Sequence, residues 1–212
     1  MSYDNLLFNI KHCGVRKLKK NIKNKGFTLI ELLAVIVILA ILLAIAVPAV
    51  TKYITKSRKD GMVSTAQGFA DAISKDTTSE FYELPVGSND ITIISVDLIK
   101  LENGKEKSPY SGRWLPRYSY VAIINTGTDE DPDYEYYVAL RDSKRYTVSL
   151  TRVGDISRSS IIRNNVSGTK APITAVCGSE DGEYMVIDKI TGLEKYQPKS
   201  GWNATVYSSQ EC

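Results

Sequence analysis

The chain has 212 residues, of which 43% are hydrophobic and 24% are charged, enough for one membrane segment and one globular domain of ordinary size. Its formal net charge of +3 is local, because residues 1–26 hold seven Lys or Arg and one acid, Asp4. From totals of 27 basic and 24 acidic side chains, residues 27–212 keep 20 basic and 23 acidic ones. This mildly acidic remainder offers no basic footprint for phosphates, so we predict no nucleic-acid partner.

The single histidine and the absence of a phosphate-loop motif exclude several kinds of catalytic site. The single histidine, His12, lies in the basic first segment, so a chain that loses this segment has no Ser/His/Asp triad, no Cys/His pair and no His-ligated zinc. The sequence also lacks a GxxxxGK[ST] phosphate loop. We therefore expect no enzyme, no cofactor and no metal site.

Residues 27–47 form an apolar segment that matches the thickness of a bilayer. As a helix, these 21 residues extend about 31 Å at about 1.5 Å per residue, against a hydrocarbon core of about 30 Å. Seven positive charges precede the segment and four follow it closely, namely Lys52, Lys56, Arg58 and Lys59. The positive-inside rule therefore predicts a single pass with a cytoplasmic N-terminus and an exported remainder.

Two ordinary interpretations of this segment are a single-pass anchor and a secretory signal peptide. Ala44-Ile45-Ala46 is an acceptable cleavage site for a signal peptide, but the uninterrupted apolar run of 16 residues, 32–47, is long for one. Neither interpretation explains Glu31, since a carboxylate at the centre of a spanning helix costs about 2.5 to 3.5 kcal/mol on insertion scales, and less near an end. A carboxylate in such a place usually marks a partner.

The stretch "KGFTLIELLAVIVILAILLAIAVPAV", residues 25–50, resembles the N-terminal signature of type IV prepilins and of the pseudopilins of type II secretion and competence systems. The resemblance implies that a prepilin peptidase cuts after Gly26 and methylates the new N-terminal residue, Phe27. Glu31 and Pro48 stand at the family's glutamate and proline positions. It also implies assembly driven by an ATPase and an inner-membrane platform protein encoded elsewhere. The signature is shared by all three systems and by major and minor subunits.

The chemistry of these residues is consistent with that resemblance. Cleavage leaves an amine on Phe27 that is protonated near neutral pH. Glu31 of one subunit can neutralise this amine on a neighbour, so that two charges that are costly in an apolar core become tolerable as a pair. We therefore predict a structural subunit that polymerises into a type IV pilus or a pseudopilus. The alternative is a membrane-anchored extracellular binding module that never polymerises, in which Glu31 is incidental.

The helical pattern continues beyond the apolar segment. Pro48 lacks a backbone N–H and is expected to kink or locally melt the helix. After it, apolar residues keep mostly to one face, which predicts an amphipathic helix that ends near Thr78. The residues of this face are Val50, Ile54, Met62, Ala66, Phe69, Ala70 and Ile73.

The rest of the chain alternates between strand-like runs and turns. Strands are predicted within 91–100 and at 117–125, 134–141 and 145–152, the last two as a hairpin, and 183–189 with 193–198 form a second hairpin. Tyr134, Tyr136, Tyr137, Trp114 and Trp202 are interpreted as core or cross-strand residues. The four acids of residues 127–133 are interpreted as a solvated loop, with a calcium site as the alternative.

The economical architecture is α+β: a long N-terminal helix packed on an antiparallel sheet, which resembles the pilin fold. The predicted domains are a cleaved cytoplasmic leader (1–26), a transmembrane and assembly helix (27–48), its amphipathic continuation (49–78) and an exported β domain (79–212). With Cys13 in the leader, Cys177 and Cys212 are the only other cysteines. They either form a disulfide, as in many type IV pilins with a bonded C-terminal loop, or remain two separate thiols.

Overall fold

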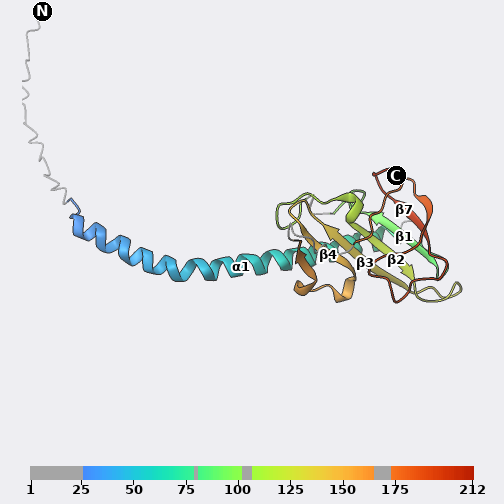
Figure 1. Ribbon diagram of the computed structural model, residues 1–212, viewed down its shortest axis with the longest axis horizontal. Helices are drawn as coiled ribbons and strands as arrows, with labels where there is room; N and C mark the ends of the chain where they lie inside the picture. The colour runs from blue at the N-terminus through green and yellow to red at the C-terminus, as the bar shows by residue number, and fades with distance from the viewer. Residues whose placement is uncertain (1–25, 79–80, 102–106, 165–172) are drawn as a thin grey trace, which may run out of the picture. The chain divides into compact units, whose positions relative to one another are not determined.

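A computed structural model describes residues 26–78, 81–101, 107–164 and 173–212 of the chain (Figure 1). The chain forms two compact units, Met1–Val47 and Pro48–Cys212. Its one long helix, α1 (Leu29–Thr78), begins in the first unit and continues into the second. All strands belong to the second unit. Except for Gly26, the predicted leader lies outside the described residues.

Helix α1 has the length that the sequence predicts. The prediction of a helix ending near Thr78 is confirmed, and Pro48 lies inside α1 with helical residues on both sides. The expected local melting at Pro48 is therefore wrong. Proline removes one backbone hydrogen bond, and the turns that flank it keep theirs, so the helix continues through the gap.

The amphipathic half of α1 packs on the sheet through its C-terminal part only. Five residues of the predicted face are buried: Met62, Ala66, Phe69, Ala70 and Ile73. Val50 and Ile54 are 55% and 45% exposed, so for these two residues the predicted contact with the β domain is wrong. The apolar periodicity runs without interruption from the membrane segment into the packed segment, which is why the sequence does not show where packing begins.

Seven strands form one sheet in the order β5-β4-β3-β2-β1-β7-β6. Their bounds are β1 (Asp90–Ser95), β2 (Tyr120–Asn125), β3 (Tyr134–Arg141), β4 (Tyr146–Arg152), β5 (Ile161–Arg163), β6 (Glu183–Ile187) and β7 (Trp202–Tyr207). Every neighbouring pair is antiparallel except β1 and β7, which are parallel. Within the described connections, short 3-10 helices lie at Pro116–Tyr118, Val153–Asp155 and Arg158–Ser160. The α+β class is confirmed, with one parallel pair that the sequence did not predict.

One of the two predicted hairpins forms. Strands β3 and β4 pair as expected, with a bulge between Val138 and Leu140. The second hairpin is wrong, because β6 pairs with β7 and not with residues 193–198. Leu193 is buried in a turn next to Gly192. Gly192 has a φ of +105° and lies against the backbone of Leu150. This turn buries Leu193 without pairing as a strand.

Both faces of the sheet are covered. One hydrophobic cluster lies between α1 and the sheet and includes Phe69, Ile94, Val121 and Leu140. A second cluster lies on the opposite face, where Ile173, Val176, Ile190 and Leu193 from the irregular segments around β6 cover the sheet. The central strand β2 is consequently buried at all six positions. Tyr137 and Trp202 are buried and Trp114, Tyr134 and Tyr136 pack at the first cluster, which confirms the core interpretation of these aromatics.

Candidate assembly site

The first turn of α1 is closed by a reciprocal pair of side chains. Oε2 of Glu31 accepts hydrogen bonds from the backbone N–H of Thr28 at 2.8 Å and from its hydroxyl at 2.9 Å. In return, the backbone N–H of Glu31 donates to Oγ1 of Thr28 at 3.3 Å. Thr28 and Glu31 thus form a capping box, in which donors left over at a helix start are satisfied by residues three positions apart.

The predicted cut lies directly before this capped turn. Gly26 and Phe27 precede α1 in extended or irregular backbone, and the Phe27 side chain is 86% exposed. A Cβ placed on Gly26 meets no atom within 4 Å. The peptide bond between these two residues is therefore not enclosed by the fold, and the capped helix begins just after it.

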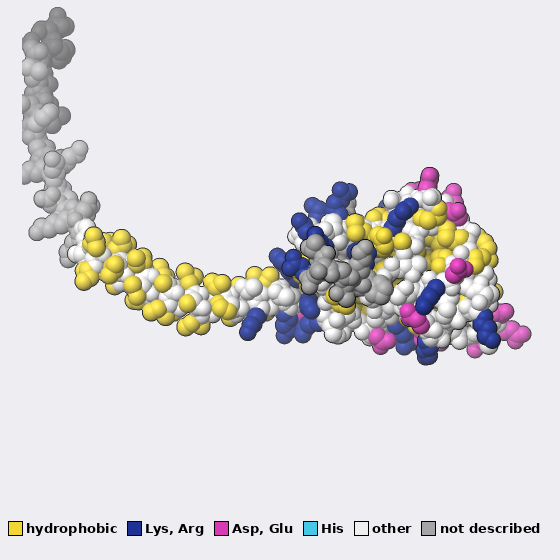
Figure 2. Space-filling model, viewed as in Figure 1, with side chains coloured by type: hydrophobic (Ala, Val, Ile, Leu, Met, Phe, Trp, Pro, Cys, Tyr) yellow, Lys and Arg dark blue, Asp and Glu magenta, His cyan; other side chains and the backbone are white. Residues whose placement is uncertain are grey.

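Helix α1 presents apolar side chains on all sides before Pro48. Its large hydrophobic residues from Leu29 to Val47 are between 49% and 83% exposed. Among the described residues, α1 is the one helix that is long and apolar enough to cross a membrane, with a mean hydropathy of 3.2 in its most apolar window. Figure 2 shows this part of the helix as a nearly continuous apolar surface. Such a surface is stable only in lipid or against other helices.

Cys177 and Cys212 form a disulfide in the structure, closing a segment of 35 residues that contains β6 and β7. The C-terminal residues are also held by hydrogen bonds. Gly178 N–H donates to the carbonyl of Gln210 at 2.9 Å, and the hydroxyl of Ser209 donates to Asp97. The carboxyl terminus is thus fixed beside the end of β7.

The acidic loop between β2 and β3 is held by the side chain of Asn125, the last residue of β2. Oδ1 of Asn125 accepts hydrogen bonds from the N–H groups of Gly127 and Asp133 at 2.9 and 3.1 Å. The side chains of Asp129, Glu130, Asp131 and Asp133 are exposed. Within the described part of the chain, no group of three or more His, Cys, Asp or Glu is placed to hold a metal ion.

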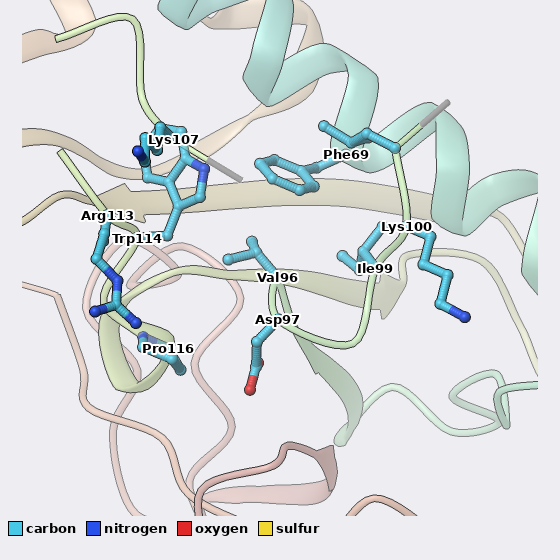
Figure 3. Close-up of a pocket in the computed structure, with 10 residues that line it drawn as sticks. Phe69, Val96, Asp97, Ile99, Lys100, Lys107, Arg113, Trp114 and Pro116 are labelled. Carbon is cyan, nitrogen blue, oxygen red and sulfur yellow. The ribbon is translucent and has the colours of Figure 1, made fainter. Parts of the chain in front are cut away.

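A cavity of about 690 Å³ lies where α1 meets the segment that follows β1. Figure 3 shows the rings of Phe69 and Trp114 on one side of it, in an edge-on contact with centroids 6.1 Å apart. Asp97 and Lys100 extend away from these rings. Among the described residues that line the cavity, the charged ones are Asp97, Lys100, Lys107 and Arg113.

The fold and this N-terminal geometry define a class of protein: a chain with one long, exposed apolar helix that fits membrane anchoring and a β domain whose sheet is covered on both faces. Residues 21–47 match the prokaryotic N-terminal methylation motif. The chain is 34% identical over 110 residues to a fimbrial protein of Moraxella nonliquefaciens, in an alignment that covers 50% of this chain and 70% of that protein. The chain belongs to the type IV pilin family. No solved structure gives a significant match.

Family membership confirms part of what the sequence predicted. The family is one of structural proteins and not of enzymes, and the apolar helix with its methylation motif fits membrane anchoring. Thr28 is the site residue that the sequence reasoning missed. The signal was present, because Thr-x-x-Glu before an apolar run is the sequence signature of a capping box.

Proposed function

We propose that this chain is a pilin or pseudopilin that polymerises into a type IV pilus or into a type II secretion or competence pseudopilus. A prepilin peptidase removes residues 1–26 and methylates Phe27, and an ATPase with a membrane platform protein drives assembly. Before assembly the N-terminus faces the cytoplasm and the β domain is exported. The same helix then leaves lipid and packs against the helices of other subunits.

The observation that carries this proposal is the placement of Glu31 at the start of a helix that is apolar on every side. An anchor needs the apolar surface, and what it gains from a carboxylate at the helix start is limited to the capping box with Thr28. The two hydrogen bonds from Thr28 go to Oε2 of this carboxylate, and a carboxylate accepts on two oxygens, so Oε1 can receive the Phe27 ammonium of a neighbouring subunit. The capped turn holds the carboxylate in a fixed position for that contact.

Sheared surface filaments from the native host test the proposal. The wild-type chain should be recovered in them, with an intact mass that corresponds to a start at N-methylated Phe27. Glu31→Ala should insert as well as the wild type, or better, and its yield in filaments should fall at least tenfold, since the amine of the neighbour is left unpaired. Glu83→Ala is the control, because Glu83 is an exposed acid of the β domain.

Three outcomes contradict the proposal in different ways. A mature N-terminus at Val47 would establish a secretory signal peptide. A processed chain that never enters filaments would support the membrane-anchored binding module. Normal filament yield from Glu31→Ala would leave assembly intact and remove the pairing of Glu31 with Phe27.

A further inference from the structure

A stripe of lysines follows the apolar segment on one side of α1. Lys52, Lys56 and Lys59 are spaced by four and three residues, so their side chains lie on one face of the helix. With Thr51, Thr55 and Arg158 they line an open groove of about 490 Å³. We call this feature the lysine groove. Figure 2 shows Lys and Arg side chains gathered where α1 enters the β domain.

The 3-10 helix Arg158–Ser160, which precedes β5, contributes Arg158 to the lining of the lysine groove. Lys59 Nζ donates hydrogen bonds to the carbonyl oxygens of Arg158 and Ile161 at 3.2 and 3.5 Å. Arg158 in turn forms an ion pair with Asp60, in which its Nη2 donates to Oδ2 at 2.9 Å. The groove is therefore shaped by contacts between residues about 100 positions apart in the chain.

The charge of the lysine groove is positive and belongs mainly to its lysines. The hydrogen bond from Arg158 holds the pKa of Asp60 below its usual value, so Asp60 remains ionised and neutralises Arg158. No Asp or Glu is among the described residues that line the groove. Lys52 and Lys56 are exposed, and their ammonium groups favour an anion in the groove.

The position along the chain points to the source of that anion. At about 1.5 Å per residue, Lys52 is about 7.5 Å and Lys56 about 13.5 Å along α1 from Val47. The headgroup zone extends about 5 to 8 Å beyond each side of the hydrocarbon core. Helical side chains tilt toward the helix N-terminus, and long lysine side chains can extend their ammonium groups several ångströms toward a headgroup zone on that side.

The positive-inside rule disfavours these lysines on the exported side of the membrane segment. Basic residues on the exported side of a span weaken the charge bias that sets its orientation, and here four of them follow within 12 residues of Val47. We infer that the lysine groove binds the phosphate of an anionic phospholipid headgroup while the subunit resides in the membrane. This inference rests on the membrane anchoring of the proposed function and adds a ligand site to it.

The rival occupant is another copy of this chain. The exposed acids of the β2–β3 loop, residues 127–133, are complementary in charge to the lysine groove. The lipid is favoured because the groove adjoins the predicted membrane segment along the chain, where headgroups surround every unassembled subunit. A contact between copies arises only during assembly.

Native mass spectrometry of the purified full-length chain tests the inference. The chain is incubated with an equimolar mixture of phosphatidylglycerol and phosphatidylcholine that carry the same acyl chains. The wild type should retain phosphatidylglycerol preferentially, and inorganic phosphate at millimolar concentration should not displace it. Lys52→Gln/Lys56→Gln should lower the preference about thirtyfold, at about fivefold for each lysine near the surface. Lys59→Gln should have a smaller effect, because Lys59 is about 18 Å along α1 from Val47.

The matched control is Lys144→Gln/Arg145→Gln, which removes two exposed positive charges at the β3–β4 turn and should keep the preference. Equal loss in this control, or no preference in the wild type, would overturn the inference. If Lys52→Gln/Lys56→Gln keeps the lipid preference of the wild type, the lysine groove does not bind the headgroup and the inference is likewise overturned. The readout uses unassembled subunits, so a failure of polymerisation in the Glu31 experiment leaves it interpretable.

Discussion

Glu31 illustrates how one side chain serves a local and an intermolecular purpose. In the single chain its carboxylate completes the first turn of α1 through Thr28. In a filament the same group would face the amine of a neighbouring Phe27. Both contacts need a charged carboxylate at a helix start, where the positive end of the helix dipole also favours it. The two purposes are separable, because Thr28 bonds directly in the local contact and acts on the intermolecular one only through the position of the carboxylate.

We expect Thr28→Ala to loosen the first turn of α1 while leaving the Glu31 charge in place. Loss of a threonine cap costs about 0.5 to 2 kcal/mol, and here it removes one donor and one acceptor. Hydrogen exchange of the Glu31 and Leu32 amides, which both donate to Thr28, should accelerate in detergent micelles by roughly twofold to thirtyfold. Filament yield should fall less than in Glu31→Ala. Unchanged exchange would mean that the capping box does not persist in the micelle.

Gly192 shows a backbone constraint at the scale of one residue. Its φ of +105° is in the region that L side chains avoid, and an added Cβ would come within 2.6 Å of the carbonyl oxygen of Leu150. Gly192→Ala should therefore destabilise the β domain by about 1 to 3 kcal/mol. Gly154→Ala is the control, because its Cβ meets no atom within 4 Å and alanine restricts the unfolded chain. In thermal unfolding, Gly192→Ala should lower the Tm relative to the wild type, and Gly154→Ala should leave the Tm nearly unchanged or raise it.

At the scale of elements, α1 has two halves that use apolar residues differently. Before Pro48 the apolar side chains surround the helix, whereas from Met62 onward they face the sheet. Phe69 lies at the centre of this packed part and meets the ring of Trp114. The part of α1 between Pro48 and Met62 is helical but is not covered by the sheet. It includes Val50, Ile54 and the lysines of the lysine groove.

Phe69→Ala should destabilise the β domain by about 3 to 5 kcal/mol, because Phe69 is only 2% exposed and its loss leaves a cavity beside Trp114. Ile54→Ala should cost less than about 1 kcal/mol, since Ile54 is 45% exposed. Denaturant unfolding of the full-length chain in detergent, followed by tryptophan fluorescence, measures both. Comparable losses in the two variants would indicate that α1 packs on the sheet earlier than Met62.

At the scale of the whole molecule, the C-terminal segment is attached to the sheet by pairing and by a covalent bond. Strand β7 inserts between β1 and β6, and the Cys177–Cys212 disulfide closes the chain beyond it. The terminal residues "SSQEC" have few apolar side chains of their own. Without the disulfide, the residues after β7 would depend on a few hydrogen bonds at the surface.

Alkylation followed by non-reducing mass spectrometry of freshly isolated protein should find no free thiol in the processed chain. Cys177→Ser/Cys212→Ser should lower stability by about 4 kcal/mol in the chain-entropy model for a loop of 35 residues, or by roughly 10 °C in Tm. The reduced wild type should behave like the variant. Two alkylatable thiols in the untreated protein would show that the cysteines are separate after export.

Sequence alone determined the features that depend on neighbouring residues. The apolar run, its basic leader and the Glu31 position follow from order along the chain, and the methylation motif matches residues 21–47. The cut between Gly26 and Phe27 stays a prediction. The length of α1 and the β3–β4 hairpin were also predictable, since helical periodicity and a short turn are local signals.

Tertiary structure decided which distant segments meet. The parallel pairing of β1 with β7 brings together residues about 110 positions apart, and nothing near Asp90 or Trp202 encodes that choice. The hydrogen bonds from Lys59 to the carbonyl oxygens of Arg158 and Ile161 also join residues about 100 positions apart, and no local signal predicts them. Apolar alternation shows that Trp202, Ala204 and Val206 face a core, but many strands satisfy the same pattern. The pairing is selected by burial of both sheet faces at once, which is a property of the whole domain.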